Sequence, residues 1–362
     1  MEGFLKMHKN NVSIIGTGRL GLCLALNLEK NGHSLICVDS NLEYINQLKN
    51  KTFSSKEPEV NELLKKSKNI EFTTDLKKSL QNDVIFIIVQ TPSTPDFKYD
   101  HSFIENISEE LIRFGKQENR KDLIINCTTF PGYCDTLHDK LKEYNYYVSY
   151  NPEFIAQGSI IKDQINADMV LIGEADKNAG DLIEKIYESF CLSKKIHKMS
   201  RTEAELTKLS LNCFLTTKIA YANMIGDICL SYKSNPDKVL GAIGEDTRVG
   251  HKYLKYGFGF GGPCFPRDNR ALHKCAAEVD IDATISKATD ESNSNHLEFQ
   301  IKDFIKNNPN KNKPVEIDYV SYKQGSDIIT ESQQFKYAKR LKDLGYTIKI
   351  KENGAEMLKM LE

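Results

Sequence analysis

Short apolar runs recur along the first part of the chain, and turn residues separate them. The first two runs, Val12–Ile15 and Leu35–Val38, have the length and β-branched content of buried strands. Four more runs of this kind follow, at Val84–Val89, Leu123–Cys127, Tyr146–Tyr150 and Met169–Ile172. Amphipathic stretches with helical spacing lie between several of them. This alternation predicts an α/β fold with a doubly wound, mostly parallel sheet.

The hydrophobic pattern changes after Arg201. From Thr202 to about Tyr232 the spacing predicts one long buried helix, which could join two domains or form a subunit interface. Its apolar positions are Leu206, Leu209, Phe214, Ile219, Ile225 and Ile228. Shorter helices are predicted at Asp237–Gly244 and Arg270–Val279.

A polar linker at residues 307–314 sets the last part of the chain apart. Beyond it we expect a strand at Val315–Tyr322, a helix around Gln334–Leu344 and a strand at Tyr346–Ile350. The sequence therefore predicts three segments: a Rossmann-type nucleotide-binding domain at 11–199, a helical central domain at 200–306 and a truncated C-terminal α/β segment at 314–362. The last segment is too short for a full-sized second nucleotide-binding domain.

A glycine-rich turn joins the first predicted strand to the first predicted helix. It reads Gly16-Thr17-Gly18-Arg19-Leu20-Gly21, and Asp39 ends the second strand. Strand, glycine turn, helix, strand and acid, in this order, form the dinucleotide-binding fingerprint. The glycines let a pyrophosphate approach the unpaired N–H groups of the helix N-terminus. Asp39 can accept hydrogen bonds from both ribose hydroxyls and repels a 2′-phosphate, so the sequence predicts NAD as the cofactor.

A polar residue beside a proline follows each of three predicted strands, at Thr91-Pro92, Thr128-Thr129-Phe130-Pro131 and Asn151-Pro152-Glu153. Taken singly, each could be ordinary turn chemistry. Ligands of open parallel sheets bind beyond the carboxyl ends of the strands, so three such pairs at one edge favour a binding site. The predicted NAD-binding residues are Gly16, Gly18, Arg19, Leu20, Gly21, Asp39, Thr91 and Thr129.

The segment Gly257–Asp268 brings together glycines, a thiol and a carboxylate. Glycines stand at 257, 259, 261 and 262, Cys264 follows, and Asp268 lies four residues later. Such glycines can expose backbone N–H groups to a ligand, and a thiol can act in covalent catalysis. A flexible loop with a buried cysteine would show the same spacing. Lys208 and Asn212 lie four residues apart on one helix face, which by spacing alone equally suits a solvated face.

Composition narrows the classes of partner. Hydrophobic residues make up 40% of the 362 residues and the formal net charge is −1, so nothing favours nucleic acid or a membrane. The first ten residues lack the apolar core of a signal peptide, and no apolar run is long enough to span a membrane. Nine cysteines without CxxC spacing indicate a reduced, cytoplasmic protein, and eight histidines without paired spacing predict no metal site.

A series of short motifs adds a more specific signal. They are Thr128-Thr-Phe-Pro131, Asn151-Pro-Glu-Phe154, Glu205-Leu-Thr-Lys208 through Asn212-Cys-Phe214, Ile243-Gly-Glu-Asp-Thr-Arg-Val249, and Phe260-Gly-Gly-Pro-Cys264-Phe-Pro-Arg-Asp268. In this order they resemble the STVP, NPEF, ELxKLxxNxF, IGxDxRI and GFGGxCFxKD motifs of the UDP-glucose/GDP-mannose dehydrogenase family. The chain is most similar to the UDP-glucose 6-dehydrogenases of that family, from about Val12 to Glu331.

The resemblance implies an NAD-dependent oxidation of UDP-glucose to UDP-glucuronate in two hydride transfers, a reaction that serves polysaccharide biosynthesis. In the family a cysteine traps the intermediate aldehyde, so Cys264 would form a thiohemiacetal and then a thioester. Lys208 and Asn212 would stabilise the oxyanions and the thiolate.

The same resemblance assigns the remaining site residues. Asp268 with Thr129 would hold a water molecule, and Glu153 would be the base for thioester hydrolysis. The residues implied to bind the nucleotide sugar are Phe154, Lys208, Asn212, Arg248, Tyr253, Lys255, Gly261, Phe265 and Lys323. Arg248 would reach across the interface of a homodimer formed through the long helix.

The sequence departs from the family pattern in three places. Gln157 stands where a glutamate is common, the loop after Pro131 reads Gly-Tyr-Cys134, and Thr330 replaces an arginine in the short C-terminal segment. Phe265, directly after the cysteine, favours the glucose-type enzymes. Oxidation of GDP-mannose or of a UDP-hexosamine is the alternative within the family, and a non-catalytic binding or regulatory protein is the alternative from another class.

Overall fold

The computed structural model describes residues 10–155, 158–352, 359 and 361. The chain forms two compact units that divide between Lys208 and Leu209. This division lies inside the long helix α8, Arg201–Ser231, and so within the segment predicted as a central domain. The predicted separation into three segments stays a prediction.

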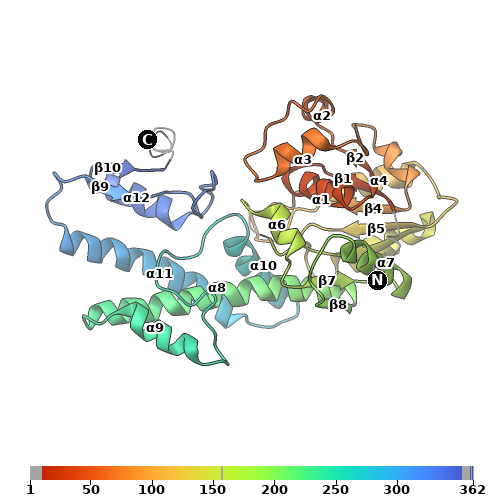
Figure 1. Cartoon of the computed structure of the whole chain (residues 1–362). Helices are drawn as coiled ribbons and strands as arrows, with labels where there is room; N and C mark the ends of the chain where they lie inside the picture. The colour runs from red at the N-terminus through yellow and green to blue at the C-terminus, as the bar shows by residue number, and fades with distance from the viewer. Residues whose placement is uncertain (1–9, 156–157, 353–358, 360, 362) are drawn as a thin grey trace, which may run out of the picture. The chain divides into compact units, whose positions relative to one another are not determined.

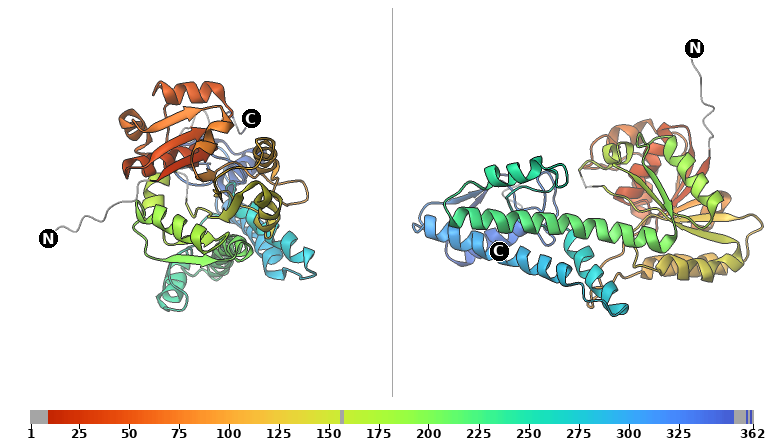
Figure 2. Two further views of the ribbon diagram at one scale, coloured as in Figure 1. Left: turned by 90° about the vertical axis from the view of Figure 1, so that its right-hand side faces the viewer. Right: turned by 90° about the horizontal axis from the view of Figure 1, so that it is seen from below.

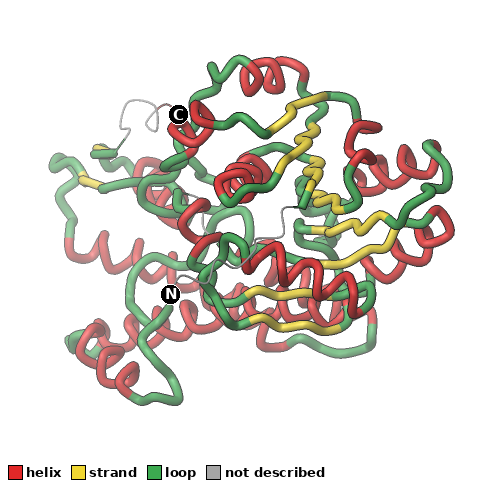
Figure 3. Tube along the Cα trace, turned by 45° about the vertical axis from the view of Figure 1, so that its right-hand side comes forward, coloured by secondary structure: helices red, strands yellow, loops and turns green. Residues whose placement is uncertain are grey.

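An eight-stranded sheet forms the centre of the first unit (Figures 1 and 3). Its strands are β1 Asn11–Ile15, β2 Ser34–Val38, β3 Ile70–Thr73, β4 Val84–Ile87, β5 Lys121–Ile125, β6 Tyr146–Tyr150, β7 Val170–Gly173 and β8 Ile196–Met199. The order is β3-β2-β1-β4-β5-β6-β7-β8, and neighbouring strands are parallel except β6 and β7. The strand order reverses direction between β1 and β4, which is the switch point of a doubly wound sheet. The predicted fold class is confirmed.

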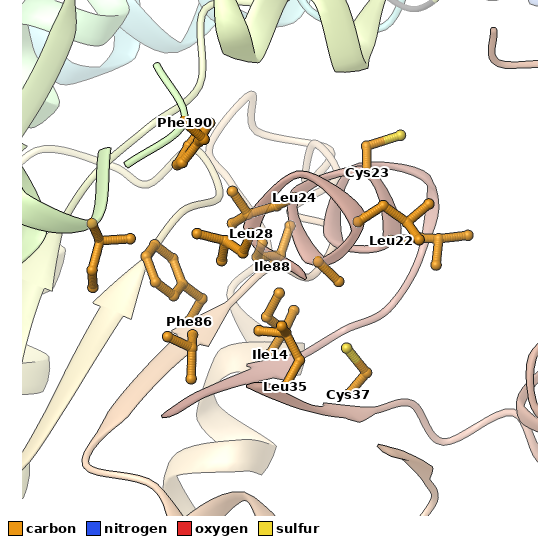
Figure 4. Packing of buried hydrophobic residues seen from close by; sticks show 14 of the residues in the cluster. Ile14, Leu22, Cys23, Leu24, Leu28, Leu35, Cys37, Phe86, Ile88 and Phe190 are labelled. Atoms are coloured by element: carbon orange, nitrogen blue, oxygen red, sulfur yellow. The ribbon is translucent and has the colours of Figure 1, made fainter. Parts of the chain in front are cut away.

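Helices cover both faces of this sheet. They are α1 Arg19–Lys30, α2 Leu42–Lys49, α3 Val60–Lys66, α4 Ser102–Arg113, α5 Tyr133–Leu141, α6 Ile160–Ile165 and α7 Lys177–Glu188. Successive strand residues point to opposite faces, so Ile14 and Ile15 belong to different apolar cores. Figure 4 shows the core that contains Ile14, where Phe86 of β4 and Leu24 and Leu28 of α1 lie together.

The second unit consists mainly of helices. Besides most of α8, it contains α9 Pro236–Glu245, α10 Phe265–Glu278, α11 Thr284–Asn307 and α12 Gln333–Asp343. Helices α8 and α11 lie side by side (Figure 2), and the Thr217 and Thr289 hydroxyl oxygens are 3.1 Å apart between them. Two short parallel strands, β9 Val315–Ile317 and β10 Ile348–Ile350, share a separate apolar core with α11 and α12.

The structure corrects several predicted elements. Helix α10 begins at Phe265, directly after Cys264, rather than at Arg270. The strand predicted at Val315–Tyr322 ends at Ile317. Strands β3 and β8 and helix α11 are additional to the predicted elements.

The apolar spacing of the long helix predicted that it is buried. The structure corrects this, because part of the surface of α8 is exposed. Leu209 is fully buried, but Phe214 is 62% exposed and Ile228 is 47% exposed. Among the helices that the described residues form, none has both the length and the apolar character needed to cross a membrane.

Candidate functional site

The turn between β1 and α1 needs its glycines for different physical reasons. Gly16 has a φ of +91°, and a Cβ there would lie 2.1 Å from the Ile88 carbonyl oxygen. A Cβ on Gly21 would lie 2.1 Å from the Gly16 carbonyl oxygen. At Gly18, the N-cap of α1, a Cβ would meet no atom of the described chain within 4 Å. The chain itself therefore gives no reason for a glycine at 18, whereas a pyrophosphate that contacts the helix N-terminus does.

Asp39 lies half-buried at the carboxyl end of β2, beside the same turn. Its Oδ2 accepts a hydrogen bond from the Thr17 N–H at 3.1 Å, and its Oδ1 accepts one from the Asn41 N–H at 3.0 Å. These bonds hold the carboxylate in place and leave lone pairs for further donors. The residues present therefore fit NAD, with the turn and Gly18 for its pyrophosphate and Asp39 for its adenosine ribose.

The loops that follow β4 and β5 are joined to each other at this edge of the sheet. The Thr91 hydroxyl donates to the Thr128 carbonyl oxygen at 2.8 Å. Thr129 is fully buried, and its hydroxyl donates to Oε1 of Glu205 on α8 at 2.7 Å. Both threonines thus lie beyond the strand ends, where doubly wound sheets bind their ligands. Their contact with NAD stays a prediction.

Glu153 follows β6 and carries a carboxyl group whose proton affinity is altered. The Tyr187 hydroxyl of α7 donates to its Oε1 at 3.2 Å. Desolvation is the largest effect and raises the pKa of Glu153 to about 7, while the Tyr187 hydrogen bond and the Lys208 charge oppose that rise. A carboxyl group with such a pKa can take up and release a proton near neutral pH, as a general base must.

Lys208 is buried and reaches the segment that contains Glu153. Its Nζ donates to the Glu153 carbonyl oxygen at 2.6 Å and lies 4.4 Å from the ring centroid of Phe154. The structure therefore brings together three residues that the sequence predicted separately. The ammonium of Lys208 is also a charge that favours a nearby anion.

Asn212 and Cys264 each contact Asp268 in the second unit. The Asn212 side-chain amide donates to Asp268 Oδ2 at 2.6 Å, and Arg267 Nε donates to Oδ1 at 2.9 Å. Cys264 is exposed and is the N-cap of α10, one turn before the fully buried Asp268. The Cys264 thiol therefore lies at the positive end of the α10 helix dipole.

The loop Gly257–Gly262 is anchored by side-chain amides. Asn293 of α11 accepts from the Phe260 N–H at 2.9 Å and donates to the Phe260 carbonyl oxygen at 3.0 Å. Asn223 of α8 accepts from the Gly257 N–H at 3.0 Å. This anchoring and the exposed Cys264 argue against a flexible loop with a buried cysteine.

Several glycines of this loop make room for the chain's own atoms. A Cβ on Gly259 would lie 2.1 Å from Asn293 Oδ1, and one on Gly261 would lie 2.5 Å from the Glu331 carbonyl oxygen. Gly262 has a φ of +83°, and its Cβ would lie 2.5 Å from the Tyr322 ring. These reasons differ from the predicted approach of a ligand. A Cβ on Gly257, by contrast, would meet no atom of the described chain within 4 Å.

Other residues predicted to bind substrate lie at the surface of the second unit. Arg248 is exposed and donates through Nε and Nη2 to the two carboxylate oxygens of Asp246, at 3.0 and 2.7 Å. The ring centroids of Tyr253 and Phe265 are 6.4 Å apart. Two further residues of this group are exposed, Lys255 and Lys323. The substrate-binding roles of all these residues stay predictions.

Glu205 and Tyr187 are among the residues at the site that carry no role in the sequence-based assignment. Glu205 stands in the motif that also contains Lys208, so its position on the same helix could have drawn attention to it. Tyr187 has no comparable signal, because only folding brings α7 to Glu153. Gln157, the predicted departure from the family pattern, lies outside the described residues.

Comparison with known proteins places the chain in a family. The NAD binding domain of the UDP-glucose/GDP-mannose dehydrogenase family matches residues 10–191, and the central domain of that family matches residues 202–295. The chain is 30% identical over 350 residues to the UDP-glucose 6-dehydrogenase YwqF of Bacillus subtilis, across 94% of this chain and 78% of that protein. It is 31% identical over 363 residues to the GDP-mannose 6-dehydrogenase of Pseudomonas aeruginosa, across 95% and 81%.

The solved structures agree with the sequence matches. The structure of a UDP-glucose dehydrogenase from the archaeon Pyrobaculum islandicum has a TM-score of 0.86 to this chain at 25% identity, and the match covers 96% of this chain and 82% of that one. The geometry of the glycine turn and Asp39 fits the dinucleotide site that such an enzyme needs. The chain therefore belongs to the UDP-glucose/GDP-mannose dehydrogenase family and is an NAD-dependent oxidoreductase.

Proposed function

We propose that this enzyme oxidises UDP-glucose to UDP-glucuronate with two molecules of NAD⁺. The observation that carries the proposal is the position of Cys264, exposed at the N-terminus of α10 and one turn before the buried Asp268. A dehydrogenase that stops at an aldehyde or ketone has no use for a nucleophilic thiol. Oxidation of a primary alcohol to an acid does, because the thiol can hold the intermediate aldehyde as a covalent adduct.

The proposed reaction has two oxidations separated by a covalent step, and bound NAD⁺ would supply the hydride acceptor for each. The primary alcohol first loses a hydride and a proton and becomes an aldehyde. The Cys264 sulfur then bonds to the aldehyde carbon, and the carbonyl oxygen takes a proton, which gives a thiohemiacetal. Loss of a second hydride and a proton yields a thioester. Water breaks the carbon–sulfur bond, releasing the acid and the thiol.

The described contacts support roles for the groups around these steps. Lys208 and Asn212 would stabilise the negative oxygen of each tetrahedral species, since one carries a charge and the other an amide donor. The water-binding roles of Asp268 and of Thr129 in alcohol oxidation are carried over from the family motifs alone. Glu153, whose pKa lies near 7, would accept the proton of the water that cleaves the thioester.

The choice of glucose rests on narrower support than the chemistry. The UDP-glucose 6-dehydrogenase and the GDP-mannose 6-dehydrogenase named above match this chain at 30% and 31% identity. Phe265 after the cysteine favours the glucose type. GDP-mannose and UDP-hexosamines are therefore the alternative substrates, and the test includes them.

The test is turnover of the purified protein with NAD⁺ and a panel of UDP- and GDP-sugars, followed by NADH absorbance. We expect two NADH for each UDP-glucose consumed and an acid as the product. The Cys264→Ser variant should make at least a hundredfold less acid, because serine is a far weaker nucleophile at neutral pH. Failure to oxidise any sugar nucleotide would refute the proposal, and unchanged acid production by the variant would remove Cys264 from it.

The proposal includes a homodimer formed through α8. Apolar residues on this helix remain exposed at intervals of three, four and seven positions, as in a helix seam. They are Phe214, Tyr221, Met224 and Ile228, with exposed fractions of 62%, 46%, 43% and 47%. A second copy of the same helix, related by a two-fold axis, would present the same residues and cover them.

A further inference from the structure

Glu205 is a fully buried carboxylate on the second turn of α8. Its Oε1 accepts from the Thr129 hydroxyl at 2.7 Å and from the Cys134 N–H at 3.0 Å, and its Oε2 accepts from the Gly132 N–H at 2.6 Å. Thr129 and Gly132 belong to the loop between β5 and α5, and Cys134 lies in the first turn of α5. One side chain of α8 therefore contacts this segment at residues 129, 132 and 134.

Burial raises the pKa of Glu205, and the hydrogen bonds from Cys134, Thr129 and Gly132 oppose that rise by favouring the ionised form. Two of the three donors are backbone N–H groups, which cannot accept a proton, and a carboxylate can accept all three bonds at once. The first N–H groups of α5 also carry the positive end of the helix dipole, and a negative charge is favoured there. Gly132, the N-cap of α5, has a φ of +86° and no side chain to cap the helix, so the cap comes from Glu205.

The contact also determines what Thr129 can do. A threonine hydroxyl has one proton to donate, and the proton of Thr129 is committed to Glu205. The Cys134 sulfur lies 3.6 Å from the same oxygen, and burial keeps the pKa of that thiol well above its usual value, so Cys134 stays protonated. Any further group that binds the Thr129 oxygen must therefore donate a proton to it, as a water or an amide can.

The loop has a second anchor on its other side. The Phe130 N–H donates to His101 Nε2 at 3.4 Å, and the rings of His101 and Tyr133 stack with centroids 3.8 Å apart. Burial lowers the pKa of His101 to about 4, so the ring is neutral and can accept this bond. Glu205 and His101 thus hold consecutive residues of the loop, and Glu205 accepts three hydrogen bonds from residues 129–134.

We propose that Glu205 is a positioning residue for the oxidation, acting through the loop 129–134 and the Thr129 hydroxyl. It holds the loop beyond β5 at the edge of the sheet where the cofactor binds, and it keeps the Thr129 oxygen as an acceptor. The role is separate from that of Lys208, three residues further along α8, which contacts the segment at 153–154. The inference rests on the proposed function for its kinetic readout only.

The test is Glu205→Gln, with Glu203→Gln as the matched control. Glu203 lies on the same helix, is exposed, and accepts from the Ser200 N–H and hydroxyl at the start of α8. Glutamine keeps the shape of Glu205 but turns an NH₂ group toward at least one N–H or O–H donor. We expect kcat for UDP-glucose to fall at least tenfold, with the KM for UDP-glucose changed less than threefold, while Glu203→Gln stays within twofold of the parent.

A double-mutant cycle with Thr129→Val separates positioning from simple destabilisation. If Glu205 acts through Thr129, the double variant should be no slower than the slower single variant. The proposal would be overturned if the decrease in kcat of the double variant equals the product of the two single decreases. A kcat of Glu205→Gln within twofold of the parent would also overturn it.

A second measurement does not depend on the substrate. Hydrogen exchange at the Gly132 and Cys134 amides should become at least tenfold faster in Glu205→Gln and stay unchanged in Glu203→Gln, because only the first variant loses their acceptor. Unchanged exchange would overturn the proposal even if no sugar nucleotide is oxidised. If exchange is faster in Glu205→Gln but the parent enzyme oxidises no sugar nucleotide, the role of Glu205 in holding the loop is supported and the proposed function is refuted.

Discussion

At the scale of single residues, Glu153 shows how a base is tuned to neutral pH. Desolvation favours its neutral form, and the Tyr187 hydroxyl and the Lys208 ammonium favour the anion. Desolvation prevails, so the pKa is about 7 rather than near 4.5. The group is therefore half-ionised near neutral pH, and small changes in its surroundings alter the fraction that can act as a base.

This balance predicts a pH dependence for the proposed hydrolysis. The base must be ionised, so activity should rise with pH through an apparent pKa near 7. Tyr187→Phe removes a hydrogen bond that favours the anion, which raises the pKa, and the acid limb of the kcat profile should move up by about one pH unit. Profiles of kcat against pH measure this shift of the acid limb, provided that thioester hydrolysis limits turnover. A burst of NADH in the first turnover would show that it does.

Tyr146→Phe is the control for the loss of a buried tyrosine hydroxyl, because that hydroxyl donates to the Leu111 carbonyl oxygen at 3.3 Å and not to a carboxylate. Its profile should match that of the parent enzyme. An acid limb that stays in place, or moves to lower pH, in Tyr187→Phe would show that Tyr187 does not act on Glu153.

The sequence could predict the residues of the site better than their partners. Gly16, Asp39, Cys264 and Asp268 stand in motifs whose order along the chain carries the information. Asn293 contacts Phe260 and Tyr187 contacts Glu153 from helices far away in the sequence, and a lone asparagine or tyrosine in a helix has no distinguishing pattern. Their contacts arise from packing that only the folded chain specifies.

At the scale of elements, the turn from β1 to α1 separates glycines needed for folding from one that folding does not require. Gly16 has a positive φ and no room for a Cβ, whereas Gly18 has a φ of −65° and no described atom within 4 Å of a Cβ. Gly18→Ala should therefore leave the melting temperature within a few degrees of the parent and raise the dissociation constant for NADH at least tenfold, because the methyl group would meet the pyrophosphate.

Gly16→Ala is the contrasting variant, since it places a Cβ 2.1 Å from the Ile88 carbonyl oxygen. It should lower the melting temperature clearly, by a mechanism that does not involve the cofactor. NADH titration and thermal unfolding of both variants check the pair. Equal NADH affinity in Gly18→Ala and the parent would show that the pyrophosphate does not approach this glycine.

Strand β8 and helix α11 were not predicted because polar residues interrupt their apolar patterns. Strand β8, Ile196–Met199, lies at the sheet edge and carries His197 and Lys198, so its pattern is not that of a buried run. Helix α11 buries Ser286, Thr289, Asn293 and His296, which are polar, so its buried face lacks the apolar spacing by which helices are recognised. The six strands with apolar sequences were predicted because burial on both faces requires such runs.

At the scale of the whole molecule, the exposed stripe on α8 predicts self-association. In a two-fold interface through this stripe, the second copy would cover Phe214 and Ile228, and a charge at either position would have to be buried or would separate the copies. We expect the parent protein to sediment as a dimer and Phe214→Asp/Ile228→Asp to sediment as a monomer with unchanged helical content.

Val279→Asp is the control, because Val279 is also an exposed apolar residue, 64% accessible, but follows α10 rather than lying on α8. It should sediment like the parent. A monomeric parent at micromolar concentration, or a dimer that survives both α8 substitutions, would refute the proposed interface.

The anchoring of Gly257–Gly262 has a consequence for how this part of the protein opens. His296 of α11 contacts the Gly257 carbonyl oxygen through Nε2 at 2.7 Å and the Asp227 carboxylate of α8 through Nδ1 at 2.8 Å, so the loop is tied to both helices at once. A loop of this composition would ordinarily fluctuate on its own, at little cost in free energy. Here the Gly257 and Phe260 N–H groups become exposed to solvent only when their hydrogen bonds to Asn223 of α8 and Asn293 of α11 break. The segment that precedes Cys264 therefore belongs to the same cooperative unfolding unit as the two helices, and it has the lifetime of a core element rather than that of a surface loop.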